Sequence, residues 1–409
     1  GTGRSLSVYR PRMSLASSTR QRDEYGIDGS GEHNVRGKGV RIGTMLRAID
    51  GKGGIGIYCQ NLMDHLLEMD RRNQYILYYA KPDCVGRYGH YDHVEERYLK
   101  APNKAVWDQL VVPWQVRRDR IEVLFHTKFT LPLFTSCRTV MAIHGASWFV
   151  APELYGKLDL AYIRMMMPLY CRKADAVLSN SQLTTDDFVR ILKVPAAKIH
   201  TARLAADDSF RPVTAPEQID AMRREYGLPE RFMLSVVKYD PRKNVPNLLE
   251  AFRLCRQRTP CRIVVVGLGC EKYREECGLQ EKGLAPDVTF LGWVDDIPRD
   301  VLSRIDLLAM PSRTEGMPMA ALEAISVGVP VVCTRVGGLP EIIRDGQEGC
   351  LVERNPESFA SAFATLAKDI DLLDRMRARC RQRWSDQFTD QAMESRYLEL
   401  YENALFRAA

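Results

Sequence analysis

Short apolar runs rich in β-branched residues alternate with helical segments along the chain, and this pattern limits the possible folds more than any other feature. The runs occupy residues 40–46, 74–79, 121–126, 138–143 and 175–180, and then 231–237, 262–267, 288–292, 306–312 and 330–334. Each run is apolar throughout, as is typical of a parallel strand covered on both faces. The sequence therefore predicts an α/β protein with two doubly wound parallel sheets, one in each of two domains.

The segment between the two series of runs predicts a domain boundary. Residues 204–218 are polar, contain two prolines and show no period, so we place the linker there, with one domain at 38–207 and the other at 208–388. Residues 1–37 hold Ser, Gly and Arg without a sustained period and predict a mostly disordered leader. Residues 389–405 have apolar positions at helical spacing and predict a C-terminal helix.

Charge and hydropathy narrow the class of protein further. The net charge of +6 is spread over 409 residues, which is too diffuse to indicate a nucleic-acid partner. No stretch reaches the roughly 18 apolar residues of a membrane span, and no signal-peptide core is evident. Eleven cysteines are scattered without zinc-ligand spacing. These features predict a cytoplasmic enzyme without a metal site.

A glycine loop, GKGGIG at residues 51–56, follows the first predicted strand and fits G-x-G-x-x-G. An ATP-binding Walker loop would continue with Lys-Ser or Lys-Thr, whereas this chain has Ile57 and Tyr58. A dinucleotide fold would carry an acidic residue about 20 positions further on, at the end of the second strand, and Tyr79 ends that strand instead. Two interpretations remain open, namely a loop that approaches a phosphate or sugar at a helix N-terminus, and a tight turn required for packing alone.

Polar and glycine residues follow most of the predicted strands at their carboxyl ends, which is where open parallel sheets bind ligands. These residues include the glycine loop, His144, Ser179 to Ser181, Lys238 to Lys243, Gly267 and Gly269, Gly292 and Trp293, and Pro311 to Glu315. If the two sheet edges face each other, these residues line one cleft.

The block PSRTEGMPMAALEAISVGVPVV, residues 311–332, carries the most informative chemistry. Glu315 and Glu323 are eight positions apart, and Pro318 predicts a helix start between them. The unpaired amides and positive potential of that helix start favour a diphosphate, while a carboxylate on either side can bind sugar or ribose hydroxyls. The alternative for Glu323 is a solvated helix glutamate.

Three cations in KYDPRKN, residues 238–244, follow another predicted strand. Taken alone they indicate a basic turn with its charges in water. If they face a helix N-terminus across the cleft, they can hold a diphosphate.

At this point the chain resembles the retaining glycosyltransferases of family 4, which have the GT-B fold, two Rossmann-like domains facing across a cleft. The resemblance covers about residues 38 to 405, and its most specific element is EGMPMAALEAISVGVPVVCTRVGGLPE, supported by GGIG, HGAS, SNSQ, PRKN and GWVDD. It implies a nucleotide diphospho-sugar donor held mainly by the second domain and an acceptor held mainly by the first. It also implies that the helix at 389–405 packs back onto the first domain.

The resemblance assigns roles to individual residues. Lys243, with Lys238, would contact the diphosphate, and Glu315 would hold the transferred sugar. Glu323 would bind the ribose, and His144 would lie beside the sugar and the acceptor. Backbone groups complete the implied site, those of Gly53, Gly54 and Ile55 from the first domain and those of Gly316, Met317, Pro318, Met319 and Leu322 from the second.

The chain departs from the family pattern in two places, since Gly145 follows His144 where many members have Asp, and Lys238 stands where many have Arg. No general base is evident, so the implied retaining mechanism is a same-face displacement in which the departing phosphate takes the acceptor proton. No metal or cofactor is implied, because Asp369-x-Asp371 falls in a predicted helix instead of after a strand.

The proposed reaction moves a hexose, with mannose favoured, from a GDP- or UDP-linked donor to a saccharide or lipid-linked saccharide during polysaccharide or glycoconjugate synthesis. The alternatives are a GT-B nucleotide-sugar epimerase and a non-catalytic nucleotide-sugar-binding protein. Residues 157–175 mix apolar and basic side chains, which is typical either of core packing or of a helix that binds a membrane surface.

Overall fold

The computed structural model describes residues 39–51, 53–206, 210, 216–258, 262–294, 305–389 and 393. The predicted leader at 1–37 lies outside this set, as do most of the predicted C-terminal helix at 389–405 and part of the predicted linker at 204–218. Among the described residues of the predicted linker, Leu204, Ala205, Ala206 and Phe210 are buried, whereas Glu217 is exposed.

The first half of the chain forms a seven-stranded sheet in the order β3-β2-β1-β4-β5-β6-β7, and all of its pairings are parallel. The strands are β1 (Arg41–Met45), β2 (Gln74–Tyr79), β3 (Val94–Tyr98), β4 (Val123–His126), β5 (Arg138–Ile143), β6 (Ala176–Ser179) and β7 (Ile199–Thr201). Strand β2 shows why an uninterrupted apolar run is needed. Its Tyr75, Leu77 and Tyr79 join the core on one face of the sheet, and its Ile76 and Tyr78 join the core on the other.

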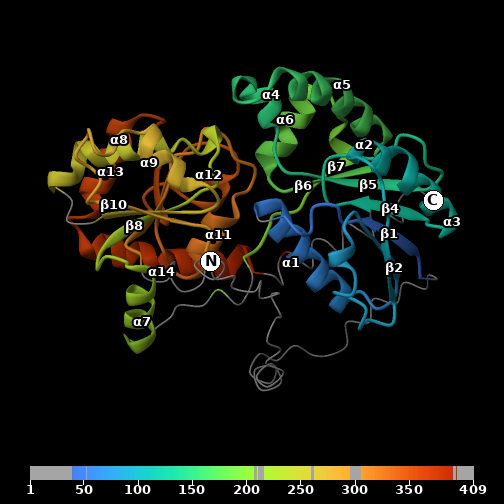
Figure 1. The fold of residues 1–409 in the computed structure, drawn as a ribbon, viewed down its shortest axis with the longest axis horizontal. Coiled ribbons are helices and arrows are strands. Elements are labelled where there is room, and N and C mark those ends of the chain that lie inside the picture. Colours follow the sequence, from blue (N-terminus) through green and yellow to red (C-terminus); the bar gives the residue numbers. More distant parts are fainter. Residues whose placement is uncertain are drawn as a thin grey trace, which may run out of the picture. The chain divides into compact units, whose positions relative to one another are not determined.

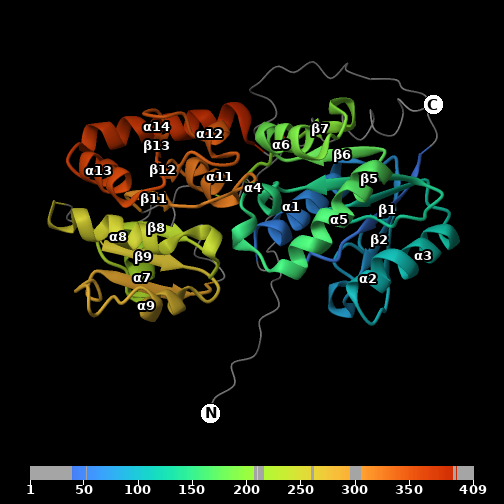
Figure 2. The ribbon, with the colours of Figure 1, turned by 90° about the horizontal axis from the view of Figure 1, so that it is seen from above.

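Helices cover both faces of this sheet (Figures 1 and 2). They are α1 (Gly54–Met69), α2 (Lys104–Val106), α3 (Val112–Arg118), α4 (Ser147–Val150), α5 (Lys157–Lys173) and α6 (Gln182–Leu192). Helix α1 packs on one face, whereas α5 and α6 pack on the other, which they cover together with α4 in Figure 1. A π-helical turn, Trp107–Val111, joins α2 to α3. Pro113 lacks the N–H that would bond to the carbonyl of residue 109, which favours this wider turn.

The second half forms a six-stranded parallel sheet in the order β10-β9-β8-β11-β12-β13. Its strands are β8 (Phe232–Val236), β9 (Arg262–Val266), β10 (Val288–Gly292), β11 (Leu307–Met310), β12 (Val331–Thr334) and β13 (Gly349–Val352). Its helices are α7 (Pro216–Tyr226), α8 (Val245–Cys255), α9 (Tyr273–Glu276), α11 (Met319–Ser326), α12 (Leu339–Ile342), α13 (Pro356–Leu366) and α14 (Ile370–Gln387). Helices α8, α9 and α13 cover one face, and α11 and α14 cover the other (Figure 1).

The two predicted parallel sheets are confirmed, and each of the ten predicted runs contains a strand. The sequence prediction missed β3, β7 and β13. Within the residues that the structure describes, no helix combines the length and the apolar character needed to cross a bilayer.

Candidate active site

The loops after β8 and β11 meet at the carboxyl edge of the second sheet, where the strand order changes direction. The β8 loop contains a 3₁₀ turn, Pro241–Lys243, which the Asp240 side chain caps by accepting from the Arg242 amide at 2.9 Å. Asn244 then adopts a left-handed φ of 51°. Its Nδ2 donates to the Pro311 carbonyl at 3.2 Å, so the two loops are tied together.

Lys243 and Glu315 meet between these loops. Lys243 Nζ donates to Glu315 Oε1 at 2.6 Å, and Ser312 Oγ donates to the same oxygen at 2.6 Å. The side chains keep 25% and 11% of their surface exposed, so the pair is partly desolvated but still reachable. A carboxylate fixed by a hydroxyl and an ammonium group can accept sugar hydroxyls, and the ammonium group can neutralise phosphate oxygens.

Helix α11 starts just beyond this pair. Pro318 is its N-cap and Met319 its first residue, as the sequence predicted, and the first amides of such a helix have no acceptor within it. Glu323 is 5% exposed, so it is not a solvated surface glutamate. Leu322 and Met317 are also buried, and the Met317 sulfur accepts from the Leu204 amide. Their side chains belong to the core, so only their backbone groups can face a ligand.

The other two cations of the β8 loop do not join Lys243 at Glu315. Lys238 is exposed, and among the described residues Glu315 Oε1 is bonded by Lys243 and Ser312 instead. Arg242 bonds to Asp240 through Nε and Nη2 at 2.5 to 3.0 Å, and its Nη1 donates to the Tyr155 hydroxyl at 3.2 Å. Its bond to Asp240 raises the pKa of Arg242. Arg242 therefore links the two domains, and the geometry brings one cation of the three to Glu315.

His144 follows β5 at the carboxyl edge of the first sheet. Its Nε2 lies 2.8 Å from the Thr127 carbonyl, which can only accept, so Nε2 carries the proton and Nδ1 is an acceptor in the neutral ring. The Tyr58 ring packs edge-on at 4.8 Å. Burial lowers the pKa of His144 to about 4, so the ring is neutral near pH 7.

Gly316 brings the two domains into contact. A Cβ added to Gly316 would lie 2.0 Å from the His144 carbonyl oxygen and 3.1 Å from Asn180 Nδ2, so no other residue fits without a shift. Gly145 lies against the same spot with φ of +132°, a conformation that favours glycine. The structure therefore places His144, Gly145, Glu315 and Gly316 together, and it gives a physical reason for the Gly145 departure.

The glycines of the GKGGIG loop divide into two kinds. A Cβ on Gly56 would lie 1.8 Å from the Gly51 carbonyl oxygen, so Gly56 serves the turn itself. A Cβ on Gly53 or Gly54 would meet nothing within 4 Å. Gly53 is the N-cap of the 16-residue helix α1, so the amides of Gly54 and Ile55 start that helix beside open space. Packing thus explains the glycine at 56, whereas the space in front of Gly53 and Gly54 leaves room for a ligand.

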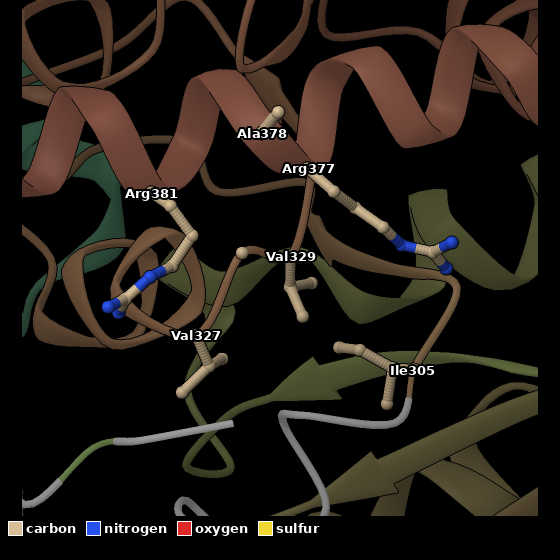
Figure 3. A pocket seen from close by; sticks show the side chains of 7 residues that line it. Ile305, Val327, Val329, Arg377, Ala378 and Arg381 are labelled. Atoms are coloured by element: carbon tan, nitrogen blue, oxygen red, sulfur yellow. The ribbon is translucent and has the colours of Figure 1, made fainter. Parts of the chain in front are cut away.

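A cavity of about 420 Å³ lies elsewhere, at the opposite edge of the second sheet. Its lining includes Ile305 and Val329, which precede β11 and β12, together with Val327, Arg377 and Arg381 (Figure 3). Arg377 pairs with Asp374 at 2.8 Å, and Arg381 donates to the Ser326 carbonyl. Glu315 follows β11 at the carboxyl edge, so this cavity is separate from the candidate site.

Sequence reasoning gave no role to several residues that shape the site, because they form no distinctive pattern. Ser312 fixes Glu315, Asn244 ties the two loops, and the Thr127 carbonyl sets the tautomer of His144. Gly337, with φ of +56°, allows the Glu315 carbonyl to approach, because a Cβ there would lie 2.1 Å away. Positive-φ positions and backbone acceptors leave little trace in a single sequence. In the described residues, no group of three or more His, Cys, Asp or Glu residues is arranged to hold a metal.

Comparisons with known proteins decide the family. Residues 218–383 match the family Glycosyl transferases group 1, and residues 52–210 match Glycosyltransferase Family 4. The chain belongs to glycosyltransferase family 4. The O-antigen chain mannosyltransferase B of Escherichia coli is 27% identical over 275 residues, which cover 66% of this chain and 69% of that protein.

Two further comparisons show how much of each relative is matched and which fold the chain has. The GDP-mannose-dependent alpha-(1-6)-phosphatidylinositol monomannoside mannosyltransferase of Mycolicibacterium smegmatis is 32% identical over 210 residues, 48% of this chain and 54% of that protein. Several such relatives are thus matched over only about half of their length. The crystal structure of Anabaena HepE in complex with UDP superimposes with a TM-score of 0.71 at 19% identity, covering 89% of this chain and 100% of that one. This glycosyltransferase therefore has the GT-B fold.

Proposed function

We propose that this glycosyltransferase moves a hexose, with mannose favoured, from a GDP- or UDP-linked donor to a saccharide or lipid-linked saccharide acceptor, with retention at the anomeric carbon. The reaction would serve the synthesis of a polysaccharide or glycoconjugate. The observation that carries the proposal is the contact of Lys243 with Glu315 immediately before helix α11. The similarity to an O-antigen mannosyltransferase and to a GDP-mannose-dependent enzyme supports mannose.

The proposed mechanism uses charges fixed before the donor binds. Lys243 and the first amides of α11 would stabilise the negative charge that develops on the departing diphosphate. Glu315 would orient the transferred sugar, and Glu323 would hold the ribose. The neutral ring of His144 would accept a hydrogen bond at Nδ1 from a hydroxyl of the sugar or the acceptor. The departing phosphate would take the acceptor proton on the same face, so the proposal requires no metal and no cofactor.

The first domain would complete the donor site from its own side. The amides of Gly54 and Ile55 lie at the start of α1, next to the open space in front of Gly53 and Gly54. They can approach a phosphate that the second domain presents. Lys238, which is exposed just after β8, would join Lys243 at the diphosphate.

A panel of nucleotide sugars tests this proposal directly. A ligand at 100 times its dissociation constant stabilises a protein by about 2.7 kcal/mol, which raises the melting temperature measurably. GDP-mannose is expected to stabilise most, and the product with an acceptor is expected to keep the anomeric configuration of the donor by NMR. An altered sugar formed from the donor alone would instead identify an epimerase. Stabilisation without any product would indicate a binding protein, and no stabilisation by any donor would refute the proposal.

A further inference from the structure

A second group of cations lies at the carboxyl edge of the first sheet. In the strand order β2-β1-β4, the chain leaves β1 toward β2 on one side and later continues from β4 on the other side. The loops after β1 and β4 therefore run in opposite directions, and open parallel sheets bind ligands at such a point. Arg47 follows β1, and Lys128 follows β4. Neither side chain has a part in the donor site described above.

Arg47 is held in place by buried partners. Its Nη2 lies 3.2 Å from Asp108 Oδ2, and the two side chains are 14% and 4% exposed. The Thr130 hydroxyl donates to the same Asp108 oxygen at 2.9 Å. Asp108 itself lies in the π-helical turn Trp107–Val111, a local irregularity that is frequent at functional sites. The network therefore fixes the guanidinium group at the sheet edge.

Lys128 lies in the chain between Thr127, which contacts His144, and Thr130, which contacts Arg47. The Thr127 carbonyl accepts from His144, and the Thr130 hydroxyl accepts from Arg47 Nη2 at 3.3 Å. Lys128 is half-buried, and the structure gives its ammonium group no hydrogen bond or ion pair within the described residues, only the ring of Phe129 at 5.4 Å. Burial lowers the pKa of Lys128, and the charges of Arg47 and Lys104 lower it further.

The electrostatics of this group are unfavourable in the protein alone. The positive charges of Arg47, Lys128 and the exposed Lys104 all act on one carboxylate, Asp108, and among the described residues only Arg47 forms an ion pair with it. Arg47 Nε and Asp108 Oδ1 are buried without a hydrogen-bond partner in the described residues. A half-buried charge without a counter-ion, such as that of Lys128, lowers the stability of the folded protein. Proteins keep such a charge where it binds a ligand of opposite charge.

We propose that Arg47 and Lys128 bind an anionic group of the acceptor, a phosphate or a carboxylate, next to His144. This inference rests on the proposed function, because His144 is where the sugar and the acceptor hydroxyl would meet. It narrows the acceptor to a charged one, such as a phosphorylated saccharide or one that contains a uronic acid. A neutral oligosaccharide would leave Lys128 without a counter-ion.

The test titrates small anions into the full chain while the donor site is filled. Saturating GDP or UDP occupies the diphosphate site around Lys243, and calorimetry then measures the binding of inorganic phosphate or of D-glucuronate. Lys128→Met is expected to weaken binding of one of these anions at least tenfold. The matched control is Lys100→Met, an exposed lysine just after β3, which is expected to leave the affinity within twofold.

Melting temperature separates this role from a structural one. Because Lys128 has unfavourable electrostatics, Lys128→Met is expected to leave the melting temperature of the ligand-free chain unchanged or higher, whereas a structural lysine would lower it. Loss of phosphate binding supports a phosphorylated acceptor, and loss of glucuronate binding supports a uronic one. Equal anion affinity in both variants and wild type, or a lower melting temperature of Lys128→Met, would overturn the inference. The two readouts are anion affinity and melting temperature and do not require sugar transfer, so the inference and the proposed function can fail separately.

Discussion

Lys243 and Glu315 are 72 residues apart in the chain, yet their side chains are 2.6 Å apart in the structure. Each follows a different strand, β8 or β11, and adjacent parallel strands bring their carboxyl ends to one edge. A residue type and a position after a strand were enough to nominate both. The residue pattern alone did not separate Lys243 from Arg242, because the preference of Arg242 for Asp240 depends on the 3₁₀ turn; the family resemblance assigned the diphosphate contact to Lys243.

Replacing Lys243 tests the assignment of the diphosphate contact. Lys243→Ala is expected to reduce kcat at least about 100-fold, or about 3 kcal/mol in the barrier, because it removes charge stabilisation in the transition state. It is also expected to weaken binding of GDP or UDP far more than that of the monophosphate GMP or UMP, which a general loss of folding would not do. Steady-state kinetics and calorimetry measure the two effects.

The control for this variant is Lys368→Ala, an exposed lysine of the same domain after α13. Its kcat is expected to equal that of the wild type. Near-wild-type turnover of Lys243→Ala would remove Lys243 from the mechanism.

His144 and Gly145 show how a departure from a family pattern can be explained locally. The neutral ring of His144 offers an acceptor at Nδ1 and cannot supply positive charge near pH 7. A residue other than glycine at 145 would have to adopt φ of +132° against Gly316. The departure is therefore compatible with tight contact between the domains, and it does not require a different reaction.

At the scale of elements, strand prediction succeeded where both faces of a strand are buried. All of Tyr75–Tyr79 is buried, so burial on both faces leaves an apolar run that can be read without a structure. The prediction missed β3, because this edge strand carries the charged residues Glu95, Glu96 and Arg97. It therefore contains no apolar run. Strand β7 was missed because it has only three residues.

Helix α5 has apolar side chains on two faces, so core packing explains only part of its sequence. Ile163, Met167, Tyr170 and Cys171 pack into the core of the first domain. Leu158 and Met165 are 88% and 62% exposed on the outer surface, with the exposed Arg164 and Arg172 on the same helix. The core interpretation therefore holds for one face only, and the outer face has the composition of a helix that binds an anionic membrane surface.

The outer face of α5 predicts peripheral membrane binding, which vesicle flotation can measure. The wild-type chain is expected to float with vesicles that contain phosphatidylglycerol and to bind phosphatidylcholine vesicles more weakly, because basic residues attract anionic lipids. The double variant Leu158→Asp/Met165→Asp is expected to reduce the bound fraction at least fivefold. Its matched control is Ile370→Asp, since Ile370 is 56% exposed on the second domain. A wild-type chain that stays wholly in solution would exclude this role.

At the scale of the whole molecule, a few residues make the polar contacts between the first and the second domain. Glu341 of α12 accepts from the Leu183 amide at 3.1 Å and from Arg203 at 3.2 Å, and Arg313 pairs with Glu153 at 3.1 Å. One hydrophobic cluster also runs through both halves of the chain, from Ile42 to Met393. Such pairings depend on how two separately folded sheets meet, so a sequence can nominate the two edges without showing how they match.

Gly316 offers the sharpest test of the contact between the domains. A methyl group there would lie 2.0 Å from the His144 carbonyl oxygen, so Gly316→Ala must move the two backbones apart. Lys243, Glu315 and α11 all lie in the second domain and would stay together, so affinity for GDP or UDP is expected to fall only by the share that the first-domain amides of Gly54 and Ile55 contribute. Transfer to the acceptor is expected to fall at least tenfold, because the acceptor side of the site would be displaced from the sugar.

Gly54→Ala is the matched control for protein packing, since its methyl group meets no protein atom within 4 Å. The melting temperature of this control variant is expected to equal that of the wild type. If Gly316→Ala transferred sugar at the wild-type rate, close approach of His144 to Gly316 would not be part of the reactive arrangement, and the site would have to form with the two domains further apart.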